Sequence, residues 1–304
     1  MKINPRTPRL REKHFIPDMN LRQTIGGMLI GLLLQAGIFA IVALVLRHRA
    51  QRERHARAMA SVRLLPWFDT DAISLLVVFI GAQVLALLLG PLFARFDNSP
   101  TDEIPLVVMM TQVLFFPAIG LAAIAHLARR RGIRTGSWYG LGDWRKNLRV
   151  LGNGGLYYLA MMPAVSITAL FFALFLQTVG YPLDRQPIIN LLMDPSQPAW
   201  LRMQIVIIAV TLVPIIEESI FRGVFLPLAL RRASPPVAVA CVSFIFAALH
   251  MHIPSFAPLF VLACAFSTAY LQTGSLAVPI IMHALFNAIS IAVLILIGDT
   301  PGMF

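Results

Sequence analysis

Charged residues and cysteines are both scarce in this sequence, and each scarcity excludes a class of protein. Only 13% of the 304 residues are charged, while 58% are hydrophobic and the mean hydropathy is +0.77. Ordinary soluble domains carry about 25% charged residues, so this composition excludes a soluble globular domain. The two cysteines, Cys241 and Cys264, fall inside apolar stretches. Neither a disulfide framework nor a thiolate metal site is therefore available.

The formal net charge of +11 lies mostly at the ends of the apolar stretches. The basic clusters are Lys2 to Arg22, Arg47 to Arg63, Arg129 to Arg134, Arg145 to Arg149, and Arg231 with Arg232. Basic residues that flank membrane spans typically mark cytoplasmic loops beside anionic lipid. The charge therefore indicates a lipid bilayer as partner, and we expect no nucleic-acid partner.

Apolar stretches long enough to cross a bilayer recur along the chain, which predicts an all-α integral membrane protein with about eight transmembrane helices. The predicted spans are Thr24–Leu46, Ala72–Phe93, Pro105–Leu127, Leu151–Val179, Arg202–Leu230, Pro236–Met251, Ser255–Gln272 and Ser275–Ile297. The first span is too long for a signal-peptide core and is read as a retained helix. The sixth and seventh spans are short, and one of them could be re-entrant.

The loop charges leave the orientation open. The loops before the second span and after the third and fifth spans are basic, which places them in the cytoplasm and the C-terminus outside. Eight spans would then put the N-terminus outside, although its own basic residues favour the inside. Either one span is miscounted or the first helix lies at the membrane surface.

Ionisable residues inside the spans are concentrated in the fifth, sixth and eighth. They are Glu217, Glu218, Arg222, His250 and His283. A charged side chain at bilayer depth costs at least about 2.5–3.5 kcal/mol, so such residues normally face a protein interior or a wet cavity. Five of them in three helices indicate a functional site between these helices.

Helical spacing assigns partners within the fifth span. Glu218 and Arg222 are four residues apart on one face, which suits an ion pair. Glu217 lies about 100° round the helix from Glu218, so it has no counter-ion on its own helix and is suited to act as a general base. Pro214 removes one helical hydrogen bond just upstream, and a local kink is expected there.

The histidines of the other two spans lie at a comparable depth. At 1.5 Å per residue, Glu217 and His250 are each about 21 Å from the basic ends of their spans. His283 and Asn287, four residues apart on one face of the eighth span, lie about 12 and 18 Å from its start. One site could therefore contain all four side chains.

Three motifs at these positions resemble the CAAX protease and bacteriocin-processing (CPBP, or Abi) family of intramembrane endopeptidases, relatives of the type II CAAX prenyl proteases. EExxxR is present as Glu217 to Arg222, FxxxH as Phe246 to His250, and HxxxN as His283 to Asn287. Any one motif alone is weak evidence. Three in order, each inside an apolar span, are a specific signal.

The resemblance implies a glutamic, metal-independent membrane peptidase without a cofactor. Glu217 and His250 would activate a water, and His283 and Asn287 would form the oxyanion hole. Glu218, Arg222 and Phe246 would support them. The resemblance further implies a peptide or protein substrate at the membrane, and a multi-pass protein of a bacterial cell or inner membrane. It covers the predicted core, residues 151–297, between an N-terminal region, 1–150, and a short tail, 298–304.

Several alternatives stay open. Glu217, His250 and His283 could form a two-histidine, one-carboxylate zinc site of a metalloprotease, although no HExxH motif is present. His252 could take the place of His250, and Asn287 could serve as an interhelical hydrogen bond. The protein could also be a non-catalytic peptide-binding or bacteriocin-immunity protein. A proton-coupled transporter is a further alternative, but no internal repeat is apparent. The oligomeric state cannot be predicted.

Overall fold

The computed structural model describes residues 21–94 and 116–297, and the regular secondary structure of this part of the chain is entirely helical. The helices are α1 (Leu21–Ala50), α2 (Arg52–Arg63), α3 (Asp69–Ala94), α5 (Phe116–Arg130), α6 (Thr135–Tyr139), α7 (Trp144–Thr178), α8 (Pro187–Met193), α9 (Ala199–Val210), α10 (Leu212–Ile220), the π-helix η2 (Phe221–Phe225), α11 (Leu226–Leu230), α12 (Pro235–Leu249), α13 (Ile253–Thr273) and α14 (Ala277–Ile297). The predicted all-α class is confirmed for these residues.

Five helical segments in the described ranges are long and apolar enough to cross a membrane, which indicates a multi-pass integral membrane protein. They lie on α1, α7, the continuous run from α9 to α11, α13 and α14. The predicted sixth span corresponds to α12, a shorter apolar helix. The second and third correspond to α3 and α5, but part of the predicted span Pro105–Leu127 lies outside the described residues. The count of eight spans stays a prediction.

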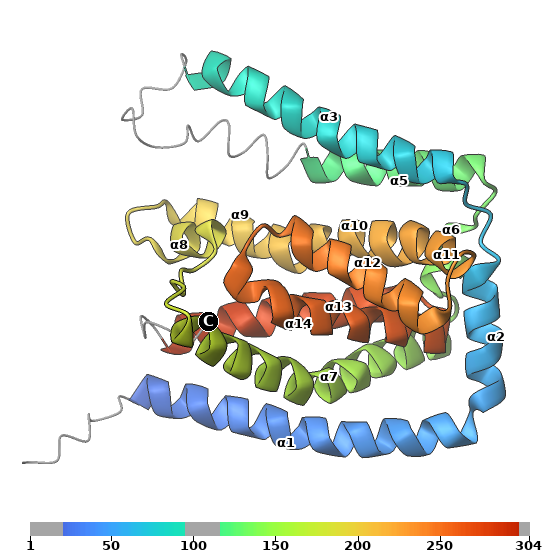
Figure 1. The fold of residues 1–304 in the computed structure, drawn as a ribbon, viewed down its shortest axis with the longest axis horizontal. Helices are drawn as coiled ribbons and strands as arrows, with labels where there is room; N and C mark the ends of the chain where they lie inside the picture. Colours follow the sequence, from blue (N-terminus) through green and yellow to red (C-terminus); the bar gives the residue numbers. More distant parts are fainter. Residues whose placement is uncertain (1–20, 95–115, 298–304) are drawn as a thin grey trace, which may run out of the picture.

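The long helices run side by side, with α7, α13 and α14 packed together in the interior (Figure 1). α1 lies along α7 on one side of this group. α3 pairs with α5 on the opposite side, where α5 contacts α10. α2 crosses one end of the bundle and links α1 to α3 (Figure 1).

The segment between the first two predicted spans is a helix, where the sequence suggested only a basic loop. α2 carries Ala56, Met59 and Val62 at a spacing of three residues, so they share one face. Val62 is buried and Met59 packs against the same core cluster, while most of the arginines point to solvent. This apolar face packs on α13, which explains why a strongly basic segment folds.

A salt bridge joins the start of α3 to the end of α5. Arg131 donates two hydrogen bonds of 2.8 Å to the carboxylate of Asp71, which is almost fully buried. Burial alone would raise the pKa of Asp71, but the hydrogen bonds from Arg131 and from the backbone N–H of Phe68 outweigh it and hold the pKa below its usual value. A bidentate pair of this kind fixes the α3–α5 pair more firmly than a solvent-exposed ion pair does.

The fifth predicted span is interrupted twice, and the first interruption lies where Pro214 led us to expect a kink. α9 ends at Val210, Thr211 forms a turn, and α10 starts at Leu212. Pro214 cannot donate a hydrogen bond to the carbonyl of Val210, and this accounts for the break. The second interruption, η2, was not predicted. π-Helical turns of this kind occur mostly as single insertions in α-helices, frequently at functional sites.

Gly154 sets the distance between α7 and α14. A Cβ atom at this position would lie 2.5 Å from Cγ2 and 2.8 Å from Cβ of Ile281. The branched side chain of Ile281 cannot rotate away from its own Cβ, so only a glycine permits this approach of the two helices. α14 is thereby held at the position from which it presents His283 and Asn287.

We predict that Gly154→Ala lowers the thermal midpoint of the detergent-purified protein, because overpacking costs about 1–3 kcal/mol. The adjacent Gly155 is the matched control, since a Cβ there meets nothing within 4 Å. Gly155→Ala should leave the midpoint unchanged or raise it, because alanine is the better helix former. Equal midpoints for the two variants would contradict the proposed close contact.

Candidate functional site

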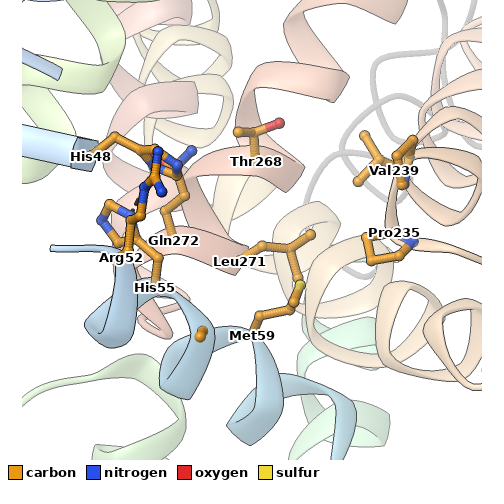
Figure 2. Close-up of a pocket in the computed structure, with 11 residues that line it drawn as sticks. His48, Arg52, His55, Met59, Pro235, Val239, Thr268, Leu271 and Gln272 are labelled. Atoms are coloured by element: carbon orange, nitrogen blue, oxygen red, sulfur yellow. Dashed lines mark hydrogen bonds between the residues drawn. The ribbon is translucent and has the colours of Figure 1, made fainter. Parts of the chain in front are cut away.

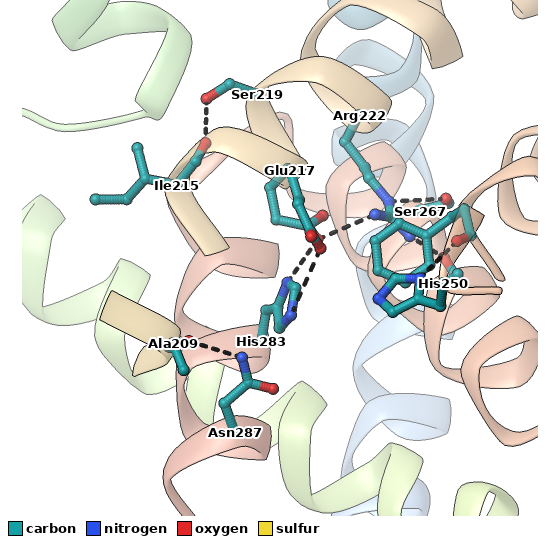
Figure 3. A network of polar contacts seen from close by, with 12 residues as sticks. Ala209, Ile215, Glu217, Ser219, Arg222, His250, Ser267, His283 and Asn287 are labelled. Carbon is teal, nitrogen blue, oxygen red and sulfur yellow. Dashed lines mark hydrogen bonds and ion pairs between the residues drawn. The ribbon is translucent and has the colours of Figure 1, made fainter. Parts of the chain in front are cut away.

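A fully buried ion pair lies at the centre of the polar network in the interior. Arg222 Nη1 donates to Glu218 Oε1 at 3.0 Å, and both side chains have no exposed surface. His283 Nδ1 lies 3.0 Å from the same oxygen (Figure 3). The Glu218–Arg222 pair predicted from the spacing is therefore confirmed, and α14 joins it through His283. The contact between His283 and Glu218 was not predicted.

α13 completes the surroundings of Arg222, although no residue pattern indicated that this helix takes part. Arg222 Nη2 donates to the backbone carbonyl of Ala263 at 2.9 Å, and Nε donates to Ser267 Oγ at 3.3 Å. The guanidinium carbon lies 4.7 Å from the ring centre of Phe246 and 5.3 Å from that of Phe266. Hydrogen bonds and cation–π contacts thus replace the water that a buried guanidinium loses.

The π-helical segment η2 contains Arg222 and depends on a glycine. A Cβ at Gly223 would lie 2.4 Å from the ring of Trp138 on α6. Trp138 is buried and belongs to the same core cluster as Phe221 and Val224. The absence of a side chain at Gly223 lets α6 close against η2. The short helix α6, which was not predicted, thus positions the Arg222 turn.

Glu217 differs from its neighbour in both exposure and bonding. Its side chain is 27% exposed, and its Oε2 accepts no hydrogen bond from the described residues. Oε2 lies 3.9 Å from His283 Nε2, which is too far for a hydrogen bond. His283 therefore stands between the two glutamates, bonded to Glu218 and adjacent to Glu217 (Figure 3). The second oxygen of Glu218 is likewise without a partner in this part of the chain.

His250 ends α12 and is joined to the network through a phenylalanine ring. Its Nδ1 lies 2.8 Å from the carbonyl oxygen of Phe246. Because a carbonyl only accepts, Nδ1 must carry the proton, so Nε2 of the neutral ring is an acceptor. The Phe246 ring centre lies 4.8 Å from that of His250 and 6.1 Å from that of His283. No hydrogen bond or ion pair connects His250 with Glu217 in the described ranges.

His252 is held differently from His250. Its Nε2 donates to the carbonyl of Asp184 at 2.9 Å, and its Nδ1 accepts from Ser255 Oγ at 2.8 Å. Both ring nitrogens are therefore occupied. Between the two histidines, Met251 adopts a left-handed φ of 51°, which is uncommon for a residue other than glycine.

Asn287 lies one turn beyond His283 on α14 and makes an interhelical hydrogen bond. Its Nδ2 donates to the carbonyl oxygen of Ala209 at 2.7 Å (Figure 3). Ala209 lies two residues before the break at Thr211. This bond is the interhelical contact that the sequence left open as an alternative role for Asn287, while its predicted oxyanion role stays a prediction. The second N–H of its amide makes no hydrogen bond to the described residues.

The structure thus brings together Glu217, Glu218, Arg222 and His283, with Asn287 on the same face of α14 as His283. The ring of Phe246 lies between His250 and His283 and separates His250 from this group. In the parts of the chain described, no group of three or more His, Cys, Asp or Glu side chains is arranged to hold a metal ion. The zinc alternative therefore gains no support from the geometry. Ser267 and Phe266 were missed because neutral residues in an apolar helix give no pattern signal.

Comparison with known proteins shows that the part of the chain that contains this site is similar to one protein family. Residues 198–289 match the model of one family, described as Rce1-like, type II CAAX prenyl endopeptidase. The match runs from the start of α9 into α14 and includes all three motifs. No curated protein matches the chain. No solved structure matches it either. Membership of this family implies a CAAX protease-like peptidase. Residues 198–289 form a domain of the Rce1-like type II CAAX prenyl endopeptidase family.

Proposed function

We propose that this protein is an intramembrane endopeptidase that hydrolyses a peptide bond with a water activated by Glu217. The observation that carries the proposal is the contrast between the two neighbouring glutamates. Glu218 is fully buried and bonded to Arg222 and His283, while 27% of the Glu217 side chain is exposed and neither an arginine nor a histidine of the described residues donates a hydrogen bond to its buried Oε2. The family match, with its implied peptide substrate, supports the same reading.

In the proposed reaction, the Glu217 carboxylate takes a proton from a water molecule as the water oxygen attacks the carbonyl carbon of the scissile peptide bond. The carbonyl π electrons move to the oxygen and form an oxyanion. When this intermediate collapses, the C–N bond breaks and the proton passes from Glu217 to the leaving amine. Atoms and protons balance without a cofactor.

His283 and Asn287 are proposed to stabilise the oxyanion. With both ring nitrogens protonated, His283 would balance Glu217, Glu218 and Arg222 to a net charge of zero. Nδ1–H would then bond to Glu218, and Nε2–H would point toward the space next to Glu217. Asn287 would add the N–H that Ala209 does not use. Donors fixed in a dry site stabilise a developing charge strongly.

His250 is proposed to assist the water, as the motif resemblance implies. The acceptor nitrogen that its hydrogen bond to Phe246 leaves free supports this role. A bound substrate or a bridging water would have to connect His250 with Glu217. We propose residues 151–297 as the catalytic core, with residues 1–150 as a separate N-terminal region.

The two glutamates offer a matched test. We predict that Glu217→Gln lowers kcat by about 10²–10⁴-fold, the usual contribution of a general base, with little change in thermal midpoint. Glu218→Gln should instead lower the stability by about 3–5 kcal/mol, because it leaves the buried charge of Arg222 without its partner. Both are checked on detergent-purified protein with a peptide substrate.

The substrate for this assay can be found by comparing the membrane peptides of cells that contain the wild-type protein with those that contain Glu217→Gln. Peptides that appear only with the wild type are products. Identical peptide profiles would refute catalysis and favour the non-catalytic binding or immunity function.

For Asn287→Ala, we predict a fall in kcat of about 10²–10³-fold at nearly constant KM, as expected when an oxyanion donor is lost. The lost hydrogen bond to Ala209 should cost only about 1 kcal/mol of stability. If KM rises and kcat does not change, Asn287 serves to hold the helices or to bind substrate, and the oxyanion role is wrong.

The two histidines near the end of α12 can be separated in the same assay. We expect His250→Gln to lower kcat by at least about 10²-fold. His252→Gln should mainly lower the thermal midpoint, because His252 uses both nitrogens to hold Asp184 and Ser255. A larger loss of kcat in His252→Gln than in His250→Gln would reverse the assignment.

A further inference from the structure

A cavity of 340 Å³ lies where α1, α2 and α7 meet the turn between α13 and α14. Four cationic side chains line it, and no aspartate or glutamate does. They are Arg47, Arg54, Lys146 and Arg149. Such a concentration of one sign of charge attracts an anion.

These four cations are not neutralised elsewhere in the described chain. Four other arginines of the described residues do have carboxylate partners: Arg57, Arg131, Arg222 and Arg232. By contrast, Arg47 donates to the neutral Asn153 at 2.7 Å, and Arg149 and Lys146 donate only to backbone carbonyls. The four positive charges therefore remain available to a ligand.

Two acidic residues that are close in sequence to these cations already have partners. Glu53 on α2 forms a 3.9 Å pair with Arg57. Asp143 caps the start of α7 and accepts a hydrogen bond from the backbone N–H of Lys146. Neither lines the cavity.

The position of the cavity matches a membrane surface. It lies at the end of the candidate span on α1, at the start of that on α7 and at the end of that on α13. α2 crosses this same end of the bundle (Figure 1). Basic pockets between transmembrane helices at the membrane surface suit the phosphate-bearing head groups of lipids.

An adjoining cavity of 500 Å³ has the character that an acyl chain requires. His55 and Gln272 line both cavities. His48, Arg52 and Thr268 also line the second cavity, and the rest of its wall is apolar, with Met59, Val239 and Leu271 among the side chains. Figure 2 shows the nitrogen-bearing side chains gathered at one end of this cavity and the apolar ones toward the other.

We infer that the two cavities together bind one anionic lipid, with its phosphate among Arg47, Arg54, Lys146 and Arg149 and an acyl chain in the apolar cavity. The four cations would attract the phosphate of a lipid head group and a free phosphate alike, because both are anions. The apolar cavity favours the lipid. This site is separate from the Glu217 site and does not rest on the proposed peptidase activity.

Native mass spectrometry of the detergent-purified full chain tests the inference, with phosphatidylglycerol as the anionic probe and phosphatidylcholine as the zwitterionic one. The wild type should bind one phosphatidylglycerol in preference to phosphatidylcholine. Arg54→Gln/Arg149→Gln should weaken phosphatidylglycerol binding about thirtyfold, since each basic residue near a membrane surface contributes about a fivefold factor. Neither side chain makes a hydrogen bond to another helix, so folding should be preserved, and an unchanged thermal midpoint checks this.

Arg129→Gln/Arg130→Gln is the matched control, because it removes two exposed charges from the end of α5. It should leave phosphatidylglycerol binding unchanged. An equal loss in the control would show a general charge effect and overturn the site. Equal binding of the two lipids would do the same. If glycerol 3-phosphate binds as tightly as phosphatidylglycerol, the cavity lined by the four cations binds a soluble anion, and the lipid proposal is wrong.

Discussion

The buried charge of Arg222 is the constraint on which the rest of the interior depends. A guanidinium with no exposed surface must recover in hydrogen bonds and charge contacts what it loses in hydration. Here Glu218 supplies the opposite charge, while Ala263 and Ser267 accept the remaining hydrogen bonds. Since these groups come from α10 and α13, the requirements of one side chain fix the relative position of two helices. His283 attaches α14 to the same carboxylate.

This arrangement also gives two adjacent glutamates different properties. Consecutive helical residues point about 100° apart, so only one of them can face Arg222. Glu218 takes that position and becomes structural. Glu217 points away from Arg222, and 27% of its side chain is exposed. Its Oε2 lies 3.9 Å from Nε2 of His283. A rigid, neutralised partner beside a free carboxylate is the kind of support that keeps a reactive group in one orientation.

Much of this site could be predicted from the sequence because its main signals are local. The four-residue spacing of Glu218 and Arg222 predicts their pair, and the 100° offset predicts that Glu217 is left out of it. The concentration of ionisable residues in three spans predicts that these helices meet. All of these follow from the period of one helix and the cost of charge in a membrane.

The remainder depends on how helices are rotated against each other, which a helical period does not encode. The contacts of Arg222 with Ser267 and Phe266 arise from α13, a helix without an acidic or basic side chain. The bond between His283 and Glu218 joins α14 to α10, while Gly154 lets α14 pack closely on α7. The helical state of α2 was hidden by its arginines, because its apolar face is narrow. η2 was hidden because a single extra residue per turn leaves no periodic trace.

The basic end of the bundle and the glutamate site are connected through α14. The basic cavity is lined by Thr273, Gly274 and Ser275, the turn that leads directly into this helix. Ser275 donates to the carbonyl of Tyr139, whose hydroxyl in turn bonds to Ser219 on α10. The start of α14 is therefore connected through Tyr139 to α10, in addition to the contact that His283 makes with Glu218. A helix fixed at two points in this way holds His283 and Asn287 at a constant distance from Glu217, and the proposed activation of a water by Glu217 requires such constancy.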